Sequence, residues 1–175
     1  MVVDPEQGTI DSPLHPSQVD LLPDVPEALS RLTSAGYGLV VVSNQPASAK
    51  GKTTRENLEN VHAKVLELAQ SAGGLILSSH ICYHRAEDQC ACRKPRPGLL
   101  EDVFRRHTAF SREASWMVGD GIADIQAGQS FGLKTAMLAK HKTETADLLK
   151  GKNAVPTLWA EDLMDFCTQI LTKKN

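Results

Sequence analysis

The 175-residue sequence has no apolar run near the ~20 residues that a transmembrane helix requires, so it predicts no membrane span. Its formal net charge is only -2, and its lysines and arginines do not cluster, so nothing points to nucleic-acid binding. The N-terminus, Met-Val-Val-Asp, lacks the pattern of a signal peptide, and repeats, linkers and low-complexity tracts are missing. These absences predict a cytoplasmic protein that binds neither nucleic acid nor a membrane.

Cysteine is also scarce, and three of the four cysteines lie within residues 81–98. Together with one histidine they form the set Cys82, His84, Cys90 and Cys92. Three sulfur ligands and one nitrogen ligand fill the tetrahedral coordination of a structural zinc and leave no position for water. Two alternatives fit less well, because the segment is too polar for a core of reduced cysteines and a disulfide would leave the histidine unused. The pattern predicts a zinc-stabilised loop.

With 41% hydrophobic residues, the chain has enough apolar mass for one domain with a sizeable core. Apolar runs and turn residues predict alternating strands and helices along the whole sequence. The predicted strands lie at residues 2–3, 39–42, from 75, 115–118 and 134–138, and the predicted helices begin after Asp24, after Thr53 or Thr54 and at Pro97, and span 122–131 and 161–171. The fold class is therefore α/β, a three-layer α/β/α sandwich with a mainly parallel, Rossmann-like sheet.

Two details of this pattern are predictions about packing. Residues 39–42 are all apolar, which is typical of a parallel strand covered on both faces. Cys167, the fourth cysteine, falls within the predicted C-terminal helix and is expected to pack as a small hydrophobic residue.

Reactive groups in such a fold collect at the C-terminal ends of the strands. Ser43 follows the second predicted strand, Lys94 follows the zinc loop, and Asp120 and Asp124 follow the fourth strand. Each has a plain alternative as a turn former or a solvated side chain. Together they offer a hydroxyl and a cation for phosphate oxygens and two carboxylates for Mg2+, which is what phosphoryl transfer requires. A helix that begins between the two aspartates would direct both at one cation.

Three motifs in this order resemble the haloacid dehalogenase (HAD) superfamily of phosphatases. They are Val-Val-Val-Ser-Asn-Gln, then Cys-x-His and Cys-x-Cys-Arg-Lys-Pro-x-Pro-Gly, then Met-Val-Gly-Asp-x-x-x-Asp. The subgroup with this zinc pattern contains the D-glycero-D-manno-heptose 1,7-bisphosphate and histidinol-phosphate phosphatases. The resemblance covers residues 21–138 and implies a HAD sheet, no large cap domain and a monomer.

The resemblance also implies roles for individual residues. Ser43 and Lys94 match the positions that hold the phosphate, with Asn44 beside them, and Arg93 matches a residue that contacts substrate. Asp120 matches a ligand of Mg2+, and Asp124 holds the same ion either directly or through the groups that coordinate it. The zinc loop and the polar loop at 44–52 would help to enclose the substrate.

The first motif of the family, Asp-x-Asp-Gly-Thr, has two possible alignments in this chain. Anchored on the strand Val2-Val3, Asp4 is the nucleophile and Glu6 the general acid and base, both also beside Mg2+. Anchored on Gly8-Thr9, the two positions fall on Pro5 and Gln7, which cannot perform this chemistry. The sequence leaves both alignments open.

Three hypotheses follow. The first is a Mg2+-dependent phosphomonoesterase that acts on a small phosphorylated metabolite through an aspartyl-phosphate at Asp4. The second is a pseudophosphatase that keeps the fold as a binding or regulatory module, and the third is a zinc-stabilised interaction domain. Ser43 and Lys94 argue against the third, since an interaction module has no need of them. Lys50 and Lys52 could meet a second phosphate, which favours a sugar bisphosphate over histidinol phosphate, although both also suit a solvated loop.

Overall fold

The computed structural model describes residues 2–3, 10–139 and 151–172. Its strands are β1 (Val2–Val3), β2 (Ile10–Asp11), β3 (Leu39–Asn44), β4 (Ile76–Cys82), β5 (Trp116–Gly119), β6 (Lys134–Leu138) and β7 (Leu158–Ala160). Its helices are the short 3-10 helix η1 (Pro16–Gln18), α1 (Val25–Ser34), α2 (Arg55–Ser71), α3 (Gly98–Arg106), α4 (Ile122–Phe131) and α6 (Leu163–Thr172). None of the helices in the described residues is long and apolar enough to cross a membrane.

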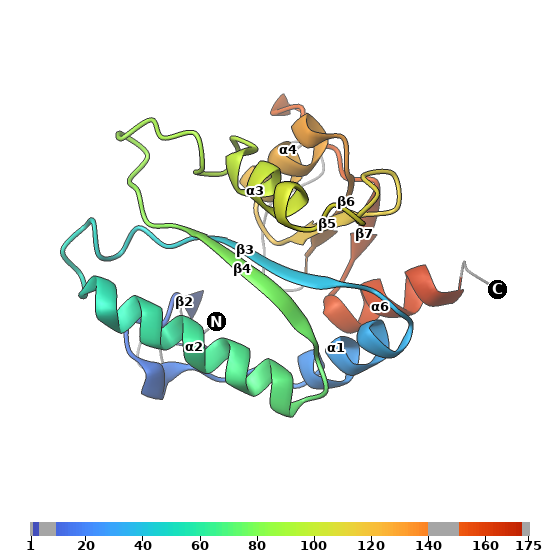
Figure 1. Cartoon of the computed structure of the whole chain (residues 1–175), viewed down its shortest axis with the longest axis horizontal. Coiled ribbons are helices and arrows are strands. Elements are labelled where there is room, and N and C mark those ends of the chain that lie inside the picture. The colour runs from blue at the N-terminus through green and yellow to red at the C-terminus, as the bar shows by residue number, and fades with distance from the viewer. Residues whose placement is uncertain (1, 4–9, 140–150, 173–175) are drawn as a thin grey trace.

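The strands pair in parallel, as the alternating pattern predicts. β3 pairs with β4, and β5, β6 and β7 form a three-stranded group in that order. Figure 1 shows α3 and α4 on one side of these strands and α1, α2 and α6 on the other. The layers therefore follow the predicted α/β/α order. The N-terminal strand is the exception to parallel pairing, because β1 pairs antiparallel with β2, which the sequence did not predict.

The core is built from the inner faces of the helices. Ala28 and Leu32 of α1 pack against Phe166, Cys167 and Ile170 of α6. Cys167 is fully buried, which confirms its prediction as a small hydrophobic residue, and this burial raises the pKa of its thiol. On the other side of the strands, a second cluster joins α3 and α4 to β5 through Leu100, Met117, Ala127, Phe131 and Leu133.

The ends of the elements follow from local chemistry. The Thr54 side chain accepts the backbone N–H of Asn57 at 3.0 Å and thereby starts α2. Gly132 ends α4 with a φ of +80°, a conformation that suits glycine. Asp24 occupies the N-terminal cap of α1, but its side chain makes no capping hydrogen bond there. The helix starts instead with Pro26 in its first turn, where the missing N–H costs nothing.

Two further expectations need correction. All six residues of β3 are partly exposed, so the strand is not fully covered on both faces as its apolar sequence predicts. β7 was not predicted at all. A strand of three residues is too short to show the alternation of apolar and polar side chains by which a strand is recognised in a sequence. Its place depends on pairing with β6, which lies some twenty residues earlier in the chain.

A buried histidine connects β4 to α3. His80 is 6% exposed, and its Nδ1 lies 2.6 Å from Asp102 Oδ2. Its other ring nitrogen lies 3.0 Å from Ser78 Oγ, which in turn lies 2.8 Å from His107 Nε2. These hydrogen bonds connect β4 to α3 and to His107, the residue that directly follows the helix.

Candidate functional site

The C-terminal ends of β3, β4 and β5 carry most of the predicted site residues. Ser43 and Asn44 are the last two residues of β3, and Asp120 directly follows β5. The loops that leave β3 and β4 depart from the same end of this strand pair (Figure 1), and the second of them carries Lys94. The parallel pairing therefore brings distant segments of the sequence to one edge.

Lys94 lies at the centre of this edge. Its Nζ donates to the Val42 carbonyl oxygen at 2.7 Å and forms an ion pair with Asp124 Oδ1 at 2.6 Å. The two side chains are 10% and 12% exposed, so this is a buried pair and not a solvated lysine. A charged pair removed from water is tolerated only when each partner compensates the other. The structure thus brings together two residues that the sequence placed at the site from separate motifs.

Asp124 is held by the start of α4. Its Oδ2 accepts the backbone N–H of Gly121 at 3.1 Å, and the helix N-terminus favours its negative charge. α4 begins at Ile122, between Asp120 and Asp124, as the predicted arrangement requires. Carboxylate oxygens on this turn are the hard ligands that Mg2+ takes, so the described part of the site fits this ion.

Gly119 makes this arrangement possible, because a side chain there would collide with Asp124. A Cβ at position 119 would lie 2.4 Å from Asp124 Oδ2. We expect Gly119→Ala to lower the free energy of unfolding by about 1–3 kcal/mol, since overpacking must displace a buried ion pair. Urea denaturation measures this change. Gly151→Ala is the control, because a Cβ there meets no atom within 4 Å. Equal stability of the Gly119→Ala and Gly151→Ala variants would contradict the steric argument.

The two polar residues at the end of β3 have different partners. Ser43 Oγ accepts a hydrogen bond from Gln45 Nε2 at 3.1 Å and remains partly exposed. The side chain of Asn44 makes two hydrogen bonds to the backbone of Lys94, at 3.0 and 3.1 Å. Ser43 therefore presents a hydroxyl at the site, whereas the Asn44 amide is directed at the protein backbone.

The predicted residues of the first motif, Asp4 and Glu6, lie outside the described residues. β1 (Val2–Val3) pairs antiparallel with β2 in a two-stranded sheet separate from the parallel strands, so the two alignments of the first motif remain predictions. Asp120 is partly exposed, directly before the helix that carries Asp124.

The second predicted metal site is complete in the described residues. One ligand atom each from Cys82, His84, Cys90 and Cys92 lies within 4.8 Å of the other three. The three sulfur atoms are 3.3–3.6 Å apart, and His84 Nδ1 lies 3.6 Å from Cys82 Sγ and 3.3 Å from Cys92 Sγ. Tetrahedral Zn–S bonds place sulfur atoms about 3.8 Å apart, so this set needs only a small expansion to hold zinc.

The crowding of the thiols shows why a cation belongs among them. Burial, followed by contacts with Cys82 and Cys90, raises the pKa of Cys92 to about 12. Three thiolates cannot share this space without a positive charge between them. A divalent metal supplies that charge and holds thiols as thiolates. The chemistry of the four ligands therefore fits the zinc ion predicted from the sequence.

We call residues 82–92 the knot. Gln45 N–H donates to the Cys82 carbonyl at 2.7 Å and thereby extends the β3–β4 ladder into it. Arg93 Nη1 donates to the His84 carbonyl at 3.0 Å, and Arg96 Nη1 donates to the Cys90 carbonyl at 2.8 Å. The guanidinium of Arg93 is thus turned toward the knot, and no described contact joins it to Lys94 or Asp124.

A hollow of about 430 Å³ lies between the knot and the loop that joins β3 to α2. Its lining comes from Ser48, Ala49, Thr53, Thr54, Arg55, Tyr83, His84 and Asp88. The guanidinium carbon of Arg55 lies 3.4 Å from the centre of the Tyr83 ring, a cation–π contact that fixes both side chains. Sequence reasoning missed these two residues. Tyr83 lies between two predicted zinc ligands, which was the available signal that it would be held near the site.

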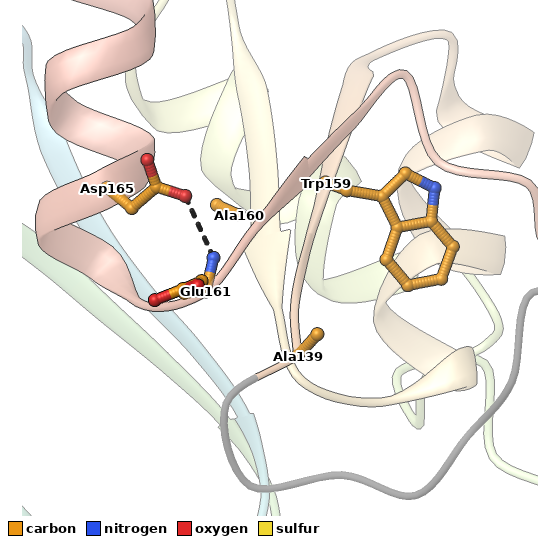
Figure 2. Close-up of a pocket in the computed structure, with 5 residues that line it drawn as sticks. All are labelled: Ala139, Trp159, Ala160, Glu161 and Asp165. Atoms are coloured by element: carbon orange, nitrogen blue, oxygen red, sulfur yellow. Dashed lines mark hydrogen bonds between the residues drawn. The ribbon is translucent and has the colours of Figure 1, made fainter.

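A second hollow lies beside β7 and does not contain this chemistry. Figure 2 shows its lining, which consists of Ala139, Trp159, Ala160, Glu161 and Asp165. The Asp165 carboxylate accepts the backbone N–H of Glu161 at 2.9 Å and a hydrogen bond from Gln169 at 3.1 Å. It therefore stabilises the start of α6 and is not directed at a ligand.

The chain is similar to known proteins over most of its length. A family model described as HAD-hydrolase-like matches residues 91–166. The D-glycero-beta-D-manno-heptose-1,7-bisphosphate 7-phosphatase of Neisseria meningitidis serogroup B is 40% identical over 151 residues, which cover 85% of this chain and 80% of that protein. The histidine biosynthesis bifunctional protein HisB of Legionella pneumophila is 34% identical over 72% of this chain, but only 36% of that protein.

A solved structure agrees with these sequence matches. It is the D,D-heptose 1,7-bisphosphate phosphatase from B. bronchiseptica complexed with magnesium and phosphate. The two chains superpose with a TM-score of 0.81 at 29% identity, over 98% of this chain and 94% of that one.

Proposed function

The chain belongs to the HAD-like hydrolases and is a phosphatase like its named relatives, and from this premise we propose that it is a single-domain, Mg2+-dependent phosphomonoesterase acting on a sugar bisphosphate such as heptose 1,7-bisphosphate. One observation carries the proposal. The buried pair of Lys94 and Asp124 contacts β3 at the Val42 carbonyl, one residue before Ser43. A cation, a hydroxyl and a carboxylate at the ends of parallel strands suit a phosphoryl group and its metal.

Each residue has a role in this proposal. Lys94 and Ser43 hold phosphate oxygens and stabilise the charge that builds up on them during transfer. Asp120 and Asp124 hold Mg2+, which when bound neutralises charge on the phosphoryl oxygens. The ion pair with Asp124 orients the Lys94 ammonium group before the substrate arrives. When the phosphate binds, Lys94 interacts with both Asp124 and the ligand.

The chemical steps use the first motif in its strand-anchored alignment. A carboxylate oxygen of Asp4 attacks phosphorus, the ester bond breaks, and Glu6 donates a proton to the departing sugar oxygen. Glu6 then takes a proton from water, which attacks the aspartyl-phosphate. Inorganic phosphate leaves, and the Asp4 carboxylate is regenerated, so atoms and protons balance over the cycle.

The hollow between the knot and the β3–α2 loop supports the choice of substrate. Its polar lining, with hydroxyl groups from Ser48 and Thr53, suits a polyhydroxylated ligand, while Arg55 is paired with Glu59 at 2.8 Å. Lys50 and Lys52 are exposed on the same loop, where they can meet a second phosphate. The relative named for heptose bisphosphate is 40% identical to this chain and the histidine biosynthesis protein 34%, which favours a sugar bisphosphate over histidinol phosphate.

The experiment that tests the proposal is phosphate release from a panel of sugar bisphosphates and histidinol phosphate, with and without Mg2+. We expect turnover that depends on Mg2+ and is fastest with a sugar bisphosphate. Preference for histidinol phosphate would overturn the substrate assignment, and equal turnover without Mg2+ would overturn the metal requirement. Zinc content and circular dichroism confirm in parallel that the protein tested is folded.

A second candidate rests on the departure of Asp4-Pro5-Glu6-Gln7 from the family motif. If the chain aligns on Gly8-Thr9, the nucleophile is missing, and the protein is a pseudophosphatase that binds a phosphorylated ligand. A folded, zinc-loaded protein that binds inorganic phosphate but releases none from any substrate would support this candidate.

A further inference from the structure

The side chain of Asn44 forms hydrogen bonds with the backbone of Lys94. Its Nδ2 donates to the Lys94 carbonyl at 3.0 Å, and its Oδ1 accepts the Lys94 backbone N–H at 3.1 Å. We infer that Asn44 is a positioning residue, which holds the backbone of Lys94 so that the ammonium group points at the phosphoryl group. This inference rests on the proposed function and departs from the role in phosphate binding that the sequence predicts.

The hydrogen bonds themselves determine the orientation of the amide. A backbone N–H can only donate and a carbonyl can only accept, so the oxygen of Asn44 must face the N–H of Lys94 and the nitrogen its carbonyl. Rotating the amide toward a ligand would break both bonds at once. Both hydrogen bonds are partly buried, and an unmade hydrogen bond of a buried group costs about 1–3 kcal/mol.

β3 thus holds Lys94 at three points. The side chain of Asn44 binds its N–H and its carbonyl, and the backbone carbonyl of Val42 binds its ammonium group at 2.7 Å. The end of β3 is itself anchored, because Asn44 pairs with Cys82 and the next N–H, from Gln45, donates to the Cys82 carbonyl. A rigid strand therefore transmits its position to the lysine.

Lys94 needs such an anchor because of its place in the chain. It lies in a loop, two residues after Cys92, and long lysine side chains lose considerable freedom when they are fixed. A misplacement of about 1 Å at a reacting group can cost about 100-fold in rate. The knot fixes the segment just before Lys94, and Asn44 fixes Lys94 itself.

The test is a double-mutant cycle with Asn44→Ala, Lys94→Ala and the double variant. If Asn44 acts through Lys94, Asn44→Ala lowers kcat by about 10- to 100-fold in the wild-type background. In the Lys94→Ala background the same change costs less than about threefold, because the group that it positions is already missing. Losses that multiply would mean that Asn44 acts on the substrate directly, which overturns the inference.

Backbone hydrogen exchange at Lys94 gives a second readout that does not depend on turnover. The Lys94 N–H should exchange faster in Asn44→Ala, since its acceptor is removed, and an unchanged rate overturns the inference. If the wild-type protein releases no phosphate, the proposed function fails while the exchange measurement still decides the role of Asn44. Gln129→Ala is the matched control, because the Gln129 amide also binds a backbone carbonyl, that of Val155, at 2.7 Å. It should change neither kcat nor exchange at Lys94.

Discussion

Asp4→Asn will lower kcat by at least about ten-thousandfold, the scale on which enzymes lose activity with their nucleophile. Asparagine has nearly the shape of aspartate, but its amide oxygen is a poor nucleophile and cannot form the aspartyl-phosphate. In the sequence Asp4 comes directly after the apolar residues Val2 and Val3, which is where the strand-anchored alignment places the nucleophile. Substrate binding should fall much less, since Ser43 and Lys94 remain.

The measurement is phosphate release under single-turnover and steady-state conditions. Asp20→Asn is the control, because the Asp20 carboxylate accepts only a local hydrogen bond from the Leu21 N–H among its described contacts. Glu6→Gln provides a graded comparison, since loss of a general acid costs about 100- to 10,000-fold. An Asp4→Asn variant as active as wild type would show that another group attacks phosphorus and that the strand-anchored alignment is incorrect.

Removal of zinc from the knot will unfold this part of the chain and abolish turnover even when Mg2+ is present in excess. Structural zinc sites of this type contribute about 10–16 kcal/mol of apparent binding energy, which a short polar loop cannot replace. Lys94 follows the last ligand by two residues, so disorder in the knot reaches the phosphate site directly. We expect the melting temperature to fall by about 10 °C or more.

Chelation followed by readdition of Mg2+ alone, and then of Zn2+, separates the two metals. Melting curves, metal analysis and phosphate release should show one zinc per chain and recovery only after Zn2+ returns. Cys90→Ser should reproduce the loss permanently. Cys167→Ala is the matched control, because this cysteine is fully buried in the core and lies far along the chain from the knot. We expect this variant to be less stable than wild type but to keep its zinc. A zinc-free protein with an unchanged melting temperature would refute the structural role of the metal.

The success of the predictions depended on the range of the interactions involved. The α4 and β6 boundaries were predicted correctly because a glycine or a helix-starting turn marks each end within a few residues. The zinc ligands were recognised because closely spaced donors in a polar segment have few other uses, and the structure places all four within reach of one ion. β7 and the antiparallel pair of β1 and β2 were missed, because short strands carry little local signal.

The same distinction applies to the site. Ser43, Lys94, Asp120 and Asp124 could be recognised in the sequence, because each follows a predicted strand or the zinc loop and has a side chain that suits phosphate or Mg2+. The sequence did not reveal that Lys94 is buried against Asp124, thirty positions away, or that the Asn44 amide is used to hold the lysine and not a ligand. It also could not show that the guanidinium of Arg93 turns to the knot.

Local order along this chain thus follows from neighbouring residues, which set helix ends, strand propensity and the spacing of metal ligands. The pairing of partners across 30 to 50 residues follows only from closure of the fold, because a side chain such as Lys94 has several possible partners until the strands fix which of them lies within about 3 Å. Here the end of β3 receives the Lys94 ammonium group at the Val42 carbonyl, and α4, which follows β5, supplies Asp124 as its buried partner.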